Sequence, residues 1–369
     1  MPTPSSACRS ERGTTISDYR LPNGTVPLLL SADTPKLLRA EAAALLTYVG
    51  DHPAVPPQRL ADMLFRTRSA RRYRALSMVA DGGLLQEALR SVVDGRDHPA
   101  VVRGERAAAA NCLAFILPGQ GGQRPGMGAV FYQSAPTFRA EADRCHGLFG
   151  ELFGESPLDY LLGTDGTGEG TTVVQSALFM QMVALGAMWR AAGVDANAVV
   201  GHSQGEIAGA YLSGKMTLED AVLIVGTRAR AVENISSDEY AMAVVAADRD
   251  ECESILARQS GWAQVSVINS PRLVGISGER ATVQATVDAL DAGGRFTRLI
   301  PVRYPAHTSV VNEFRAEIEA AIHDRVVNPR FLDSDIDCIG STLGEAVTPA
   351  IALAEYWFCL LYTSDAADE

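Results

Sequence analysis

The chain has 369 residues, of which 47% are hydrophobic and 21% charged, and its formal net charge is -12. This is a globular composition, long enough for two or three domains with buried cores. The negative charge argues against a general nucleic-acid binder, because such proteins concentrate Lys and Arg against phosphates. The six cysteines form no C-x-x-C pair, so we expect reduced thiols, no structural metal and a cytoplasmic location.

The N-terminal part predicts a small α/β domain. Residues 1–25 lack periodicity, and we expect them to be disordered. An apolar run from Val26 predicts a strand, and Thr34 before a proline predicts the N-cap of a helix. A helix, a strand and a second helix are then expected at residues 57–67, 72–80 and 83–93. The small domain is assigned to residues 26–105.

A second apolar strand, residues 112–117, breaks into the glycine-rich sequence PGQGGQRPGM before a helix-like stretch that begins at Ala129. In such an arrangement backbone N–H groups converge on an anion. A plain tight turn explains the stretch equally well. It lacks the Lys-Ser/Thr ending of a P-loop, so a nucleotide is not predicted.

The most apolar segment runs from Ser176 to Trp189 and contains Gln181. Because it is closed by Arg190, we interpret it as too short to span a membrane. A buried helix is expected here, and no membrane partner.

The sequence VVGHSQGEIAGAYLSG, from Val199 to Gly214, places Ser203 in a Gly-x-Ser-x-Gly pattern between an apolar strand and a helix. This is typical of a nucleophile elbow, in which a strained turn exposes the hydroxyl and the helix N-terminus favours negative charge. Serine between glycines also occurs in ordinary turns, but the flanking strand and helix favour catalysis. His202 is adjacent and would point away, so we assign it to packing or hydrogen bonding within the elbow.

A serine nucleophile needs a histidine to accept its proton. His307 follows the predicted strand 296–302, where the chain leaves a small domain, and active sites often form at such junctions. Its position alone also fits a structural histidine. The remaining candidates have no distinctive setting and are interpreted as surface or packing residues: His52, His98, His146 and His323.

Thr217, with Asp220 three residues later, predicts the start of a helix whose otherwise apolar length carries Arg228 and Arg230. A buried arginine requires a partner, and its planar guanidinium favours a carboxylate. The residues alone leave open whether that carboxylate belongs to a ligand or to an internal Asp or Glu.

Between Tyr240 and Val302 the pattern alternates in the order strand, helix, strand, strand, helix, strand. That order is a split βαβ, the ferredoxin-like arrangement. We expect residues 240–302 to form a small subdomain inserted into a larger one, made of residues 106–239 and 303–358.

The chain resembles the malonyl-CoA:acyl carrier protein transacylase-like acyltransferase domains of modular type I polyketide synthases. The motifs that carry this resemblance are, in chain order, PGQGGQRPGM, GHSQGE, Arg228, NSPRLVGISG and YPAHT. The similarity runs from about Val26 to Phe358. It implies an α/β fold: an α/β-hydrolase-like large subdomain with a parallel sheet, an inserted ferredoxin-like subdomain, and residues 26–105 as the linker that joins ketosynthase to acyltransferase. A narrower likeness is to the acyltransferase subunit of mycobactin-type siderophore synthases.

The resemblance assigns roles position by position. Ser203 would be the acylated nucleophile and His307 its general base. The backbone N–H groups of Gln120 and Gln204 would form the oxyanion hole, and Arg228 would bind the carboxylate of the extender unit. The other substrate-binding residues would be Gln175, Asn269, Tyr304 and Ala306.

The implied reaction moves a malonyl or methylmalonyl unit from coenzyme A to the phosphopantetheine of an acyl carrier protein, without a bound cofactor and beside other synthase modules. Tyr304 and Ala306 leave room for a methyl branch, and Gln204 agrees. One methyl is worth only about 1 to 3 kcal/mol in such a pocket, so the choice stays open. The alternatives are a serine hydrolase or thioesterase, and an inactive fragment, because residues 359–369 match nothing in the family.

Overall fold

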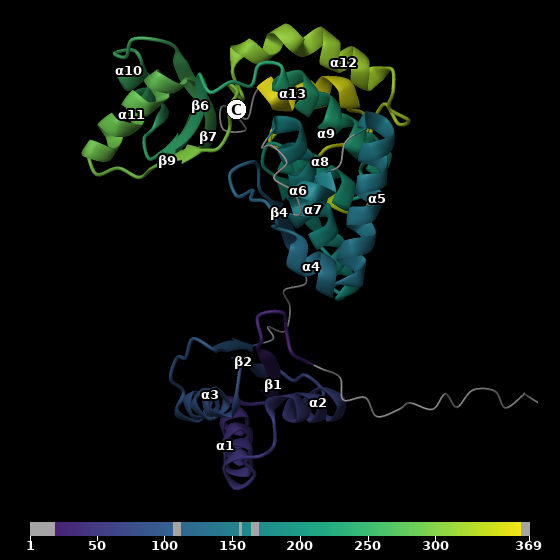
Figure 1. Cartoon of the computed structure of the whole chain (residues 1–369), viewed down its shortest axis with the longest axis vertical. Coiled ribbons are helices and arrows are strands. Elements are labelled where there is room, and N and C mark those ends of the chain that lie inside the picture. The colour runs from purple at the N-terminus through teal and green to yellow at the C-terminus, as the bar shows by residue number, and fades with distance from the viewer. Residues whose placement is uncertain (1–18, 106–111, 155–156, 164–169, 363–369) are drawn as a thin grey trace, which may run out of the picture. The chain divides into compact units, whose positions relative to one another are not determined.

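The computed structural model describes residues 19–105, 112–154, 157–163 and 170–362. Residues 1–18 of the segment expected to be disordered, and residues 363–369 of the unusual tail, lie outside the described residues. The expectation of disorder to residue 25 is wrong for its last part, because the Leu21 and Gly24 N–H groups make the backbone hydrogen bonds of a turn. The chain divides into two compact units, Met1–Ala110 and Asn111–Glu369 (Figure 1). Each unit has a hydrophobic core of its own.

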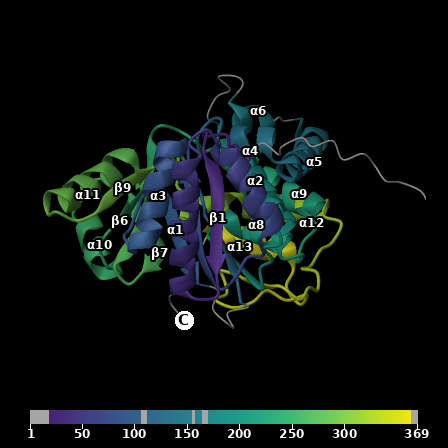
Figure 2. The same cartoon turned by 90° about the horizontal axis from the view of Figure 1, so that it is seen from below.

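The N-terminal unit is an antiparallel sheet in the order β1-β2-β3 with three helices. Its elements are β1 (Val26–Ala32), α1 (Pro35–Asp51), α2 (Pro57–Thr67), β2 (Tyr73–Val79), α3 (Gly82–Asp94) and β3 (Val101–Glu105). In Figure 2, α1 and α3 lie side by side, and α1 lies next to β1.

Local signals in the sequence account for most of this unit. Thr34 caps α1 as predicted, because its hydroxyl accepts a hydrogen bond of 3.2 Å from the N–H of Leu37. The first two strands and all three helices are confirmed. Strand β3 was not predicted, because VVRGE shows no alternation of apolar and polar residues. In the structure Val102 is 63% exposed, so burial does not hold this strand in place. Pairing with β2 supplies its backbone hydrogen bonds instead.

The C-terminal unit begins with β4 and is rich in helices. Up to residue 233 its elements are β4 (Ala114–Leu117), α4 (Ala129–Ser134), α5 (Pro136–Phe153), α6 (Pro157–Leu162), α7 (Thr171–Ala191), β5 (Ala198–Gly201), α8 (Gly205–Leu212) and α9 (Leu218–Glu233). The expected parallel sheet is confirmed, with strand order β10-β5-β4.

Helix α7 corrects one step of the sequence reasoning. It has 21 residues and extends beyond the predicted segment, so it is long and apolar enough to cross a membrane by length and composition. However, 72% of its most apolar window is buried inside the protein. The prediction of a buried helix is therefore confirmed by packing, and the argument from insufficient length is wrong.

Each strand and helix predicted between Tyr240 and Val302 is present. They are β6 (Tyr240–Val245), α10 (Arg249–Leu256), β7 (Ala263–Ser270), β8 (Leu273–Glu279), α11 (Arg280–Ala292) and β9 (Thr297–Ile300). The four strands form an antiparallel sheet in the order β7-β8-β6-β9. A separate hydrophobic cluster lies between this sheet and its two helices.

The remaining elements return to the parallel sheet. They are η1 (Ser309–Phe314), α12 (Arg315–His323), β10 (Asp337–Ile339) and α13 (Leu353–Tyr362). Helix α13 continues through Cys359, so the first residues of the unusual tail are helical and Leu360 is fully buried.

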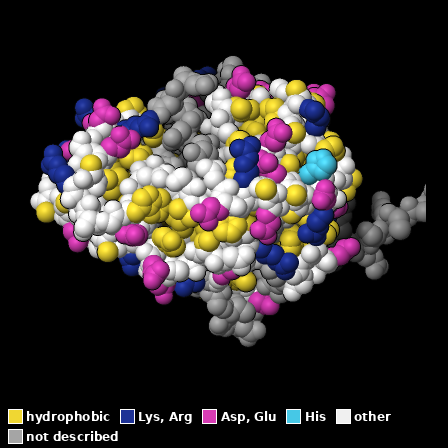
Figure 3. All heavy atoms as spheres, turned by 90° about the horizontal axis from the view of Figure 1, so that it is seen from above, with side chains coloured by type: hydrophobic (Ala, Val, Ile, Leu, Met, Phe, Trp, Pro, Cys, Tyr) yellow, Lys and Arg dark blue, Asp and Glu magenta, His cyan; other side chains and the backbone are white. Residues whose placement is uncertain are grey.

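On the face shown in Figure 3, Lys and Arg side chains are interspersed with Asp and Glu.

Candidate active site

The turn between β5 and α8 holds Ser203 in a strained conformation. Its φ is 51°, and His307, with φ 57°, is the only other non-glycine residue with positive φ in the described part of the chain. Such backbone strain persists only where the surroundings enforce it, and it is concentrated at functional sites. Ser203 Oγ lies 3.0 Å from His307 Nε2, within hydrogen-bonding distance.

Two glycines make this turn possible. A Cβ added to Gly201 would overlap the backbone of Glu206, and one added to Gly205 would overlap the carbonyl of Leu117. Strand β4, strand β5 and helix α8 therefore approach so closely that neither position has room for a side chain. The Gly-x-Ser-x-Gly pattern is thus a packing requirement of the elbow.

His307 is buried, with 6% of its surface exposed. Burial is the main cause that lowers the pKa of His307 to about 3, and the positive charge of Arg228 lowers it further. The imidazole is therefore neutral at neutral pH and able to accept the Ser203 proton.

The other ring nitrogen of His307 has no carboxylate partner among the residues that the structure describes. Within the described ranges, Nδ1 makes no hydrogen bond of normal geometry. The nearby group is the backbone carbonyl of Leu360 in the last turn of α13, which partly offsets the fall in the His307 pKa. A Ser-His-Asp triad, as in the serine-hydrolase alternative, is not assembled here.

A small cavity of about 70 Å³ brings most of the predicted site together. Six predicted residues line it: Gln120, Ser203, Asn269, Tyr304, Ala306 and His307. The apolar part of the cavity wall comes from β6, β7 and β9. The sequence did not predict that side chains of these strands line the site; they are Met242, Val244, Val267, Ile300 and, just after β9, Val302. Burial lowers the pKa of His202, and the Asn269 side chain on β7 partly offsets that fall.

Gln175 is not among the residues that line the cavity, and lies behind it. Its amide donates to the Tyr304 hydroxyl at 3.0 Å and to Gln120 Oε1 at 3.3 Å, while that hydroxyl donates to Gln120 Oε1 at 3.0 Å. The Gln204 side chain donates to the backbone carbonyl of Gln175. Burial raises the pKa of Tyr304 to about 12, so its hydroxyl stays protonated. These side chains hold the cavity wall in a fixed arrangement.

The backbone N–H groups of Gln120 and Gln204 flank the serine. A Cβ added to Gly119, the residue before Gln120, would lie 3.4 Å from Ser203 Cβ, and Gln204 directly follows the serine. Neither N–H donates a hydrogen bond within the described residues, which leaves both available to an incoming oxygen.

Arg228 is not among the residues that line the cavity; it is 4% exposed and belongs to the buried residues of α9. Burial lowers its pKa to about 10, so the guanidinium remains charged at neutral pH. Its Nε has no hydrogen-bond partner, and no Asp or Glu lies within ion-pair distance among the residues that the structure covers. Its charge acts on Tyr304, on His307 and on the internal acid Glu206. Among the described residues this attraction to Glu206 is not an ion-pair contact, and a ligand carboxylate stays the predicted partner.

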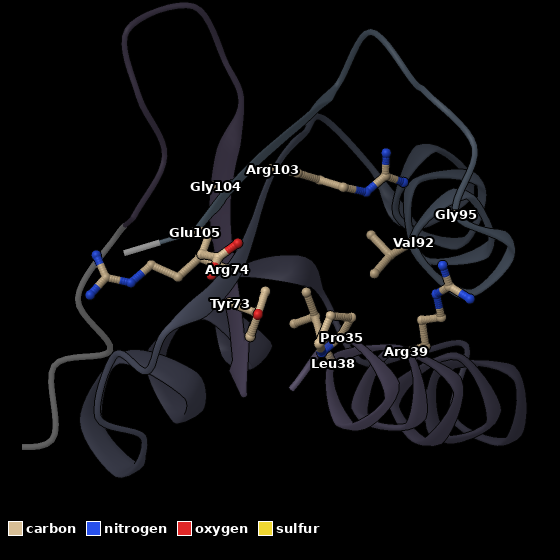
Figure 4. Close-up of a pocket in the computed structure, with 10 residues that line it drawn as sticks. All are labelled: Pro35, Leu38, Arg39, Tyr73, Arg74, Val92, Gly95, Arg103, Gly104 and Glu105. Atoms are coloured by element: carbon tan, nitrogen blue, oxygen red, sulfur yellow. The ribbon is translucent and has the colours of Figure 1, made fainter. Parts of the chain in front are cut away.

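Several pockets in the described part of the chain are larger than this cavity. One, of about 340 Å³ in the N-terminal unit, is lined by Arg39, Arg103 and eight other residues without any Ser, Cys or His (Figure 4). The Arg103 guanidinium is engaged by the backbone carbonyl of Ser91 at 2.8 Å. Another, of about 790 Å³ beside β4 and α7, is mainly apolar and shares Gly119 with the site cavity. Neither contains a nucleophile paired with a base.

Comparison with known proteins shows the family to which the chain is similar. Residues 114–361 match the family model of the acyl transferase domain. A spectinabilin polyketide synthase system protein of Streptomyces orinoci is 32% identical over 338 residues, which cover 91% of this chain and 9% of that protein. An erythronolide synthase of Saccharopolyspora erythraea is 30% identical over 340 residues, covering 92% of this chain and 10% of that protein. The chain thus spans about a tenth of the length of these relatives.

A solved structure is similar over most of the chain. The acyltransferase domain from module 8 of the salinomycin polyketide synthase superimposes with a TM-score of 0.79 at 30% identity. The match covers 92% of this chain and 80% of that domain structure.

Proposed function

Because the chain belongs to the acyl transferase domain family, we propose that it moves a malonyl-type unit from coenzyme A to the phosphopantetheine thiol of an acyl carrier protein. The observation that carries this proposal is the 3.0 Å contact between Ser203 Oγ and a buried, neutral His307. Arg228, a buried cation without an internal ion pair, directs the proposal to an acyl group that carries a carboxylate.

In the first half-reaction, Ser203 Oγ attacks the thioester carbonyl while His307 Nε2 takes its proton. The carbonyl oxygen becomes negative, and the N–H groups of Gln120 and Gln204 stabilise it. Collapse breaks the C–S bond, and the proton on His307 passes to the departing coenzyme A thiolate. The product is a malonyl ester on Ser203 and free coenzyme A.

The second half-reaction runs in the opposite sense. His307 takes the proton of the phosphopantetheine thiol, and the sulfur attacks the ester carbonyl. The C–O bond to Ser203 breaks, and His307 returns the proton to the serine oxygen. All proton transfers use one histidine, so the proposed chemistry requires no bound cofactor or metal.

Arg228 would form a bidentate pair with the free carboxylate of the acyl group. The wall formed by Tyr304, Ala306 and Gln204 leaves both malonyl and methylmalonyl units as candidate substrates. Other polyketide synthase modules as partners and a cytoplasmic location belong to the same proposal.

The finer domain division is also proposed. The element order and the sheet order β7-β8-β6-β9 support a ferredoxin-like subdomain at residues 240–302. The parallel sheet and the elbow support an α/β-hydrolase-like large subdomain at residues 106–239 and 303–358. Residues 26–105 would then be the linker domain, and residues 359–369 a separate tail, of which the family match includes only residues 359–361.

The test is intact-mass measurement after mixing with malonyl-CoA or methylmalonyl-CoA, followed by addition of phosphopantetheinylated carrier protein. We expect the acyl mass to appear on this chain and then move to the carrier. A hydrolase would release the acyl group to water and leave the carrier unloaded. An inactive fragment would gain no mass from either donor. Comparing the two donors also determines the preferred extender unit.

A further inference from the structure

Glu206 is a buried carboxylate that the mechanism above does not use. It lies in the first turn of α8, three residues after Ser203, and is 0% exposed. One of its oxygens accepts hydrogen bonds from the backbone N–H of Ser341 at 3.0 Å and from the Ser341 hydroxyl at 2.7 Å. The other accepts from the Tyr356 hydroxyl. The helix that begins at the nucleophile is thus bonded to α13 through a single side chain.

Tyr356 connects this carboxylate to the general base. It lies on α13 one helical turn before Leu360, so the two residues share a face of the helix. Helix α13 packs against η1, which begins two residues after His307. Burial lowers the pKa of His307, and the Leu360 backbone on this helix partly offsets that fall.

The packing around Tyr356 leaves its ring one position. The rings of Phe331 and Trp357 meet it edge to face, with centroids 5.1 and 5.0 Å away. A Cβ added to Gly340 would collide with the Tyr356 hydroxyl and lie 3.1 Å from Glu206 Oε1. Without that hydroxyl, a buried carboxylate oxygen would lose its donor, which is costly in a dry interior.

We propose that Glu206 is a positioning residue that acts through Tyr356. By fixing α13 against the elbow helix, it holds the Leu360 carbonyl beside His307 and keeps the imidazole aligned with Ser203. Glu206 lies within one helical turn of Ser203. The same short segment therefore carries the nucleophile and the carboxylate that holds α13 in place. The inference rests on the proposed acyl transfer, since it assigns His307 as the base.

The position matters because His307 has no carboxylate to orient it, as shown by the unpaired Nδ1 in the described chain. Displacing a reacting group by about 1 Å can cost a hundredfold in rate. A small shift of α13 would therefore be visible in the acylation step, while leaving the binding of coenzyme A esters unchanged.

The test compares Tyr356→Phe with a matched control, Tyr211→Phe. Tyr211 is also on α8, and its hydroxyl donates to another mostly buried carboxylate, Glu141 on α5, away from the residues that line the cavity. Both variants lose one tyrosine–carboxylate hydrogen bond. We expect Tyr356→Phe to lower kcat for malonyl transfer about tenfold to a hundredfold with KM unchanged. Tyr211→Phe should lower the Tm and leave kcat at the wild-type value.

Glu206→Gln keeps the shape of the side chain and should lower kcat like Tyr356→Phe. The double variant should be no slower than the slower single variant, because both changes remove the same link. Additive losses, or wild-type kcat in Tyr356→Phe with a lower Tm, would overturn the positioning role.

A spectroscopic readout separates this inference from the proposed function. In protein labelled with ¹⁵N-histidine, the Nδ1 proton of His307 should give a slowly exchanging signal in the wild type and in Tyr211→Phe. That signal should exchange rapidly in Tyr356→Phe. Persistence of the slow signal in Tyr356→Phe would contradict the inference even if the chain proved unable to transfer malonyl groups, since this measurement needs no turnover.

Discussion

Replacing Arg228 with alanine tests how the site selects its acyl group. The guanidinium is 4% exposed, stays charged because its pKa is about 10, and forms no ion pair with an acidic residue in the described chain. A substrate carboxylate would therefore be its first full partner. Truncating one member of a buried charge pair costs roughly 2 to 5 kcal/mol. At 1.4 kcal/mol per tenfold, kcat/KM for malonyl-CoA should fall about 30-fold to several thousandfold.

Acetyl-CoA carries no carboxylate and should respond differently. Removing the charge leaves a more apolar space, so Arg228→Ala should accept acetyl groups at least as well as the wild type does. Arg228→Lys should restore malonyl transfer only in part, because an ammonium cannot reproduce the two parallel hydrogen bonds of a guanidinium.

The assay is kcat/KM for malonyl-CoA and acetyl-CoA with the wild type and both variants, and the Tm of each protein controls for folding. The ratio of the two donors is the decisive quantity, since a folding defect lowers both values together. Equal losses for malonyl and acetyl donors would refute carboxylate recognition and make Arg228 a structural residue.

Four further predictions concern the base and the elbow. His307→Ala should slow acylation of Ser203 by at least about a hundredfold in single-turnover mass measurements, and a near-normal rate would remove His307 from the mechanism. Burial holds the pKa of His307 at about 3, so the acylation rate of the free enzyme should change smoothly from pH 8 to pH 5. A histidine base with an ordinary pKa would instead give an inflection of that rate near pH 6.5. The same depressed pKa means that His307 contributes stability above pH 6.5 that is lost as the pH falls toward 3, which urea unfolding at several pH values would detect. Gly201→Ala should destabilise the fold by several kcal/mol in the same urea assay, because its Cβ would overlap Glu206, and a wild-type midpoint would contradict the packing described for the elbow.

The residues that sequence reasoning located are those with strong local signals. Ser203 stands in a glycine pattern between a strand and a helix, and Thr34 precedes a proline and a periodic helix. Strand β3 (Val101–Glu105) carries no such signal, because it is fixed by its partner β2 and not by its own pattern. Local periodicity therefore predicts most elements and fails where pairing alone decides.

The supporting residues of the site are harder to find from sequence. Glu206 and Tyr356 are 150 residues apart in the chain, and nothing local predicts that they meet. A charged residue in the otherwise apolar run after Ser203 was the available signal for Glu206. The Leu360 carbonyl is a backbone group, so the identity of its side chain carries no information about its role.

The most direct test of the account is the location of the acyl ester after brief exposure to malonyl-CoA. Peptide mapping by tandem mass spectrometry should place the malonyl group on Ser203 in the wild type, and Ser203→Ala should gain no mass while keeping the wild-type Tm. A malonyl adduct on another residue, or an adduct that persists in Ser203→Ala, would contradict the claim that this serine is the nucleophile.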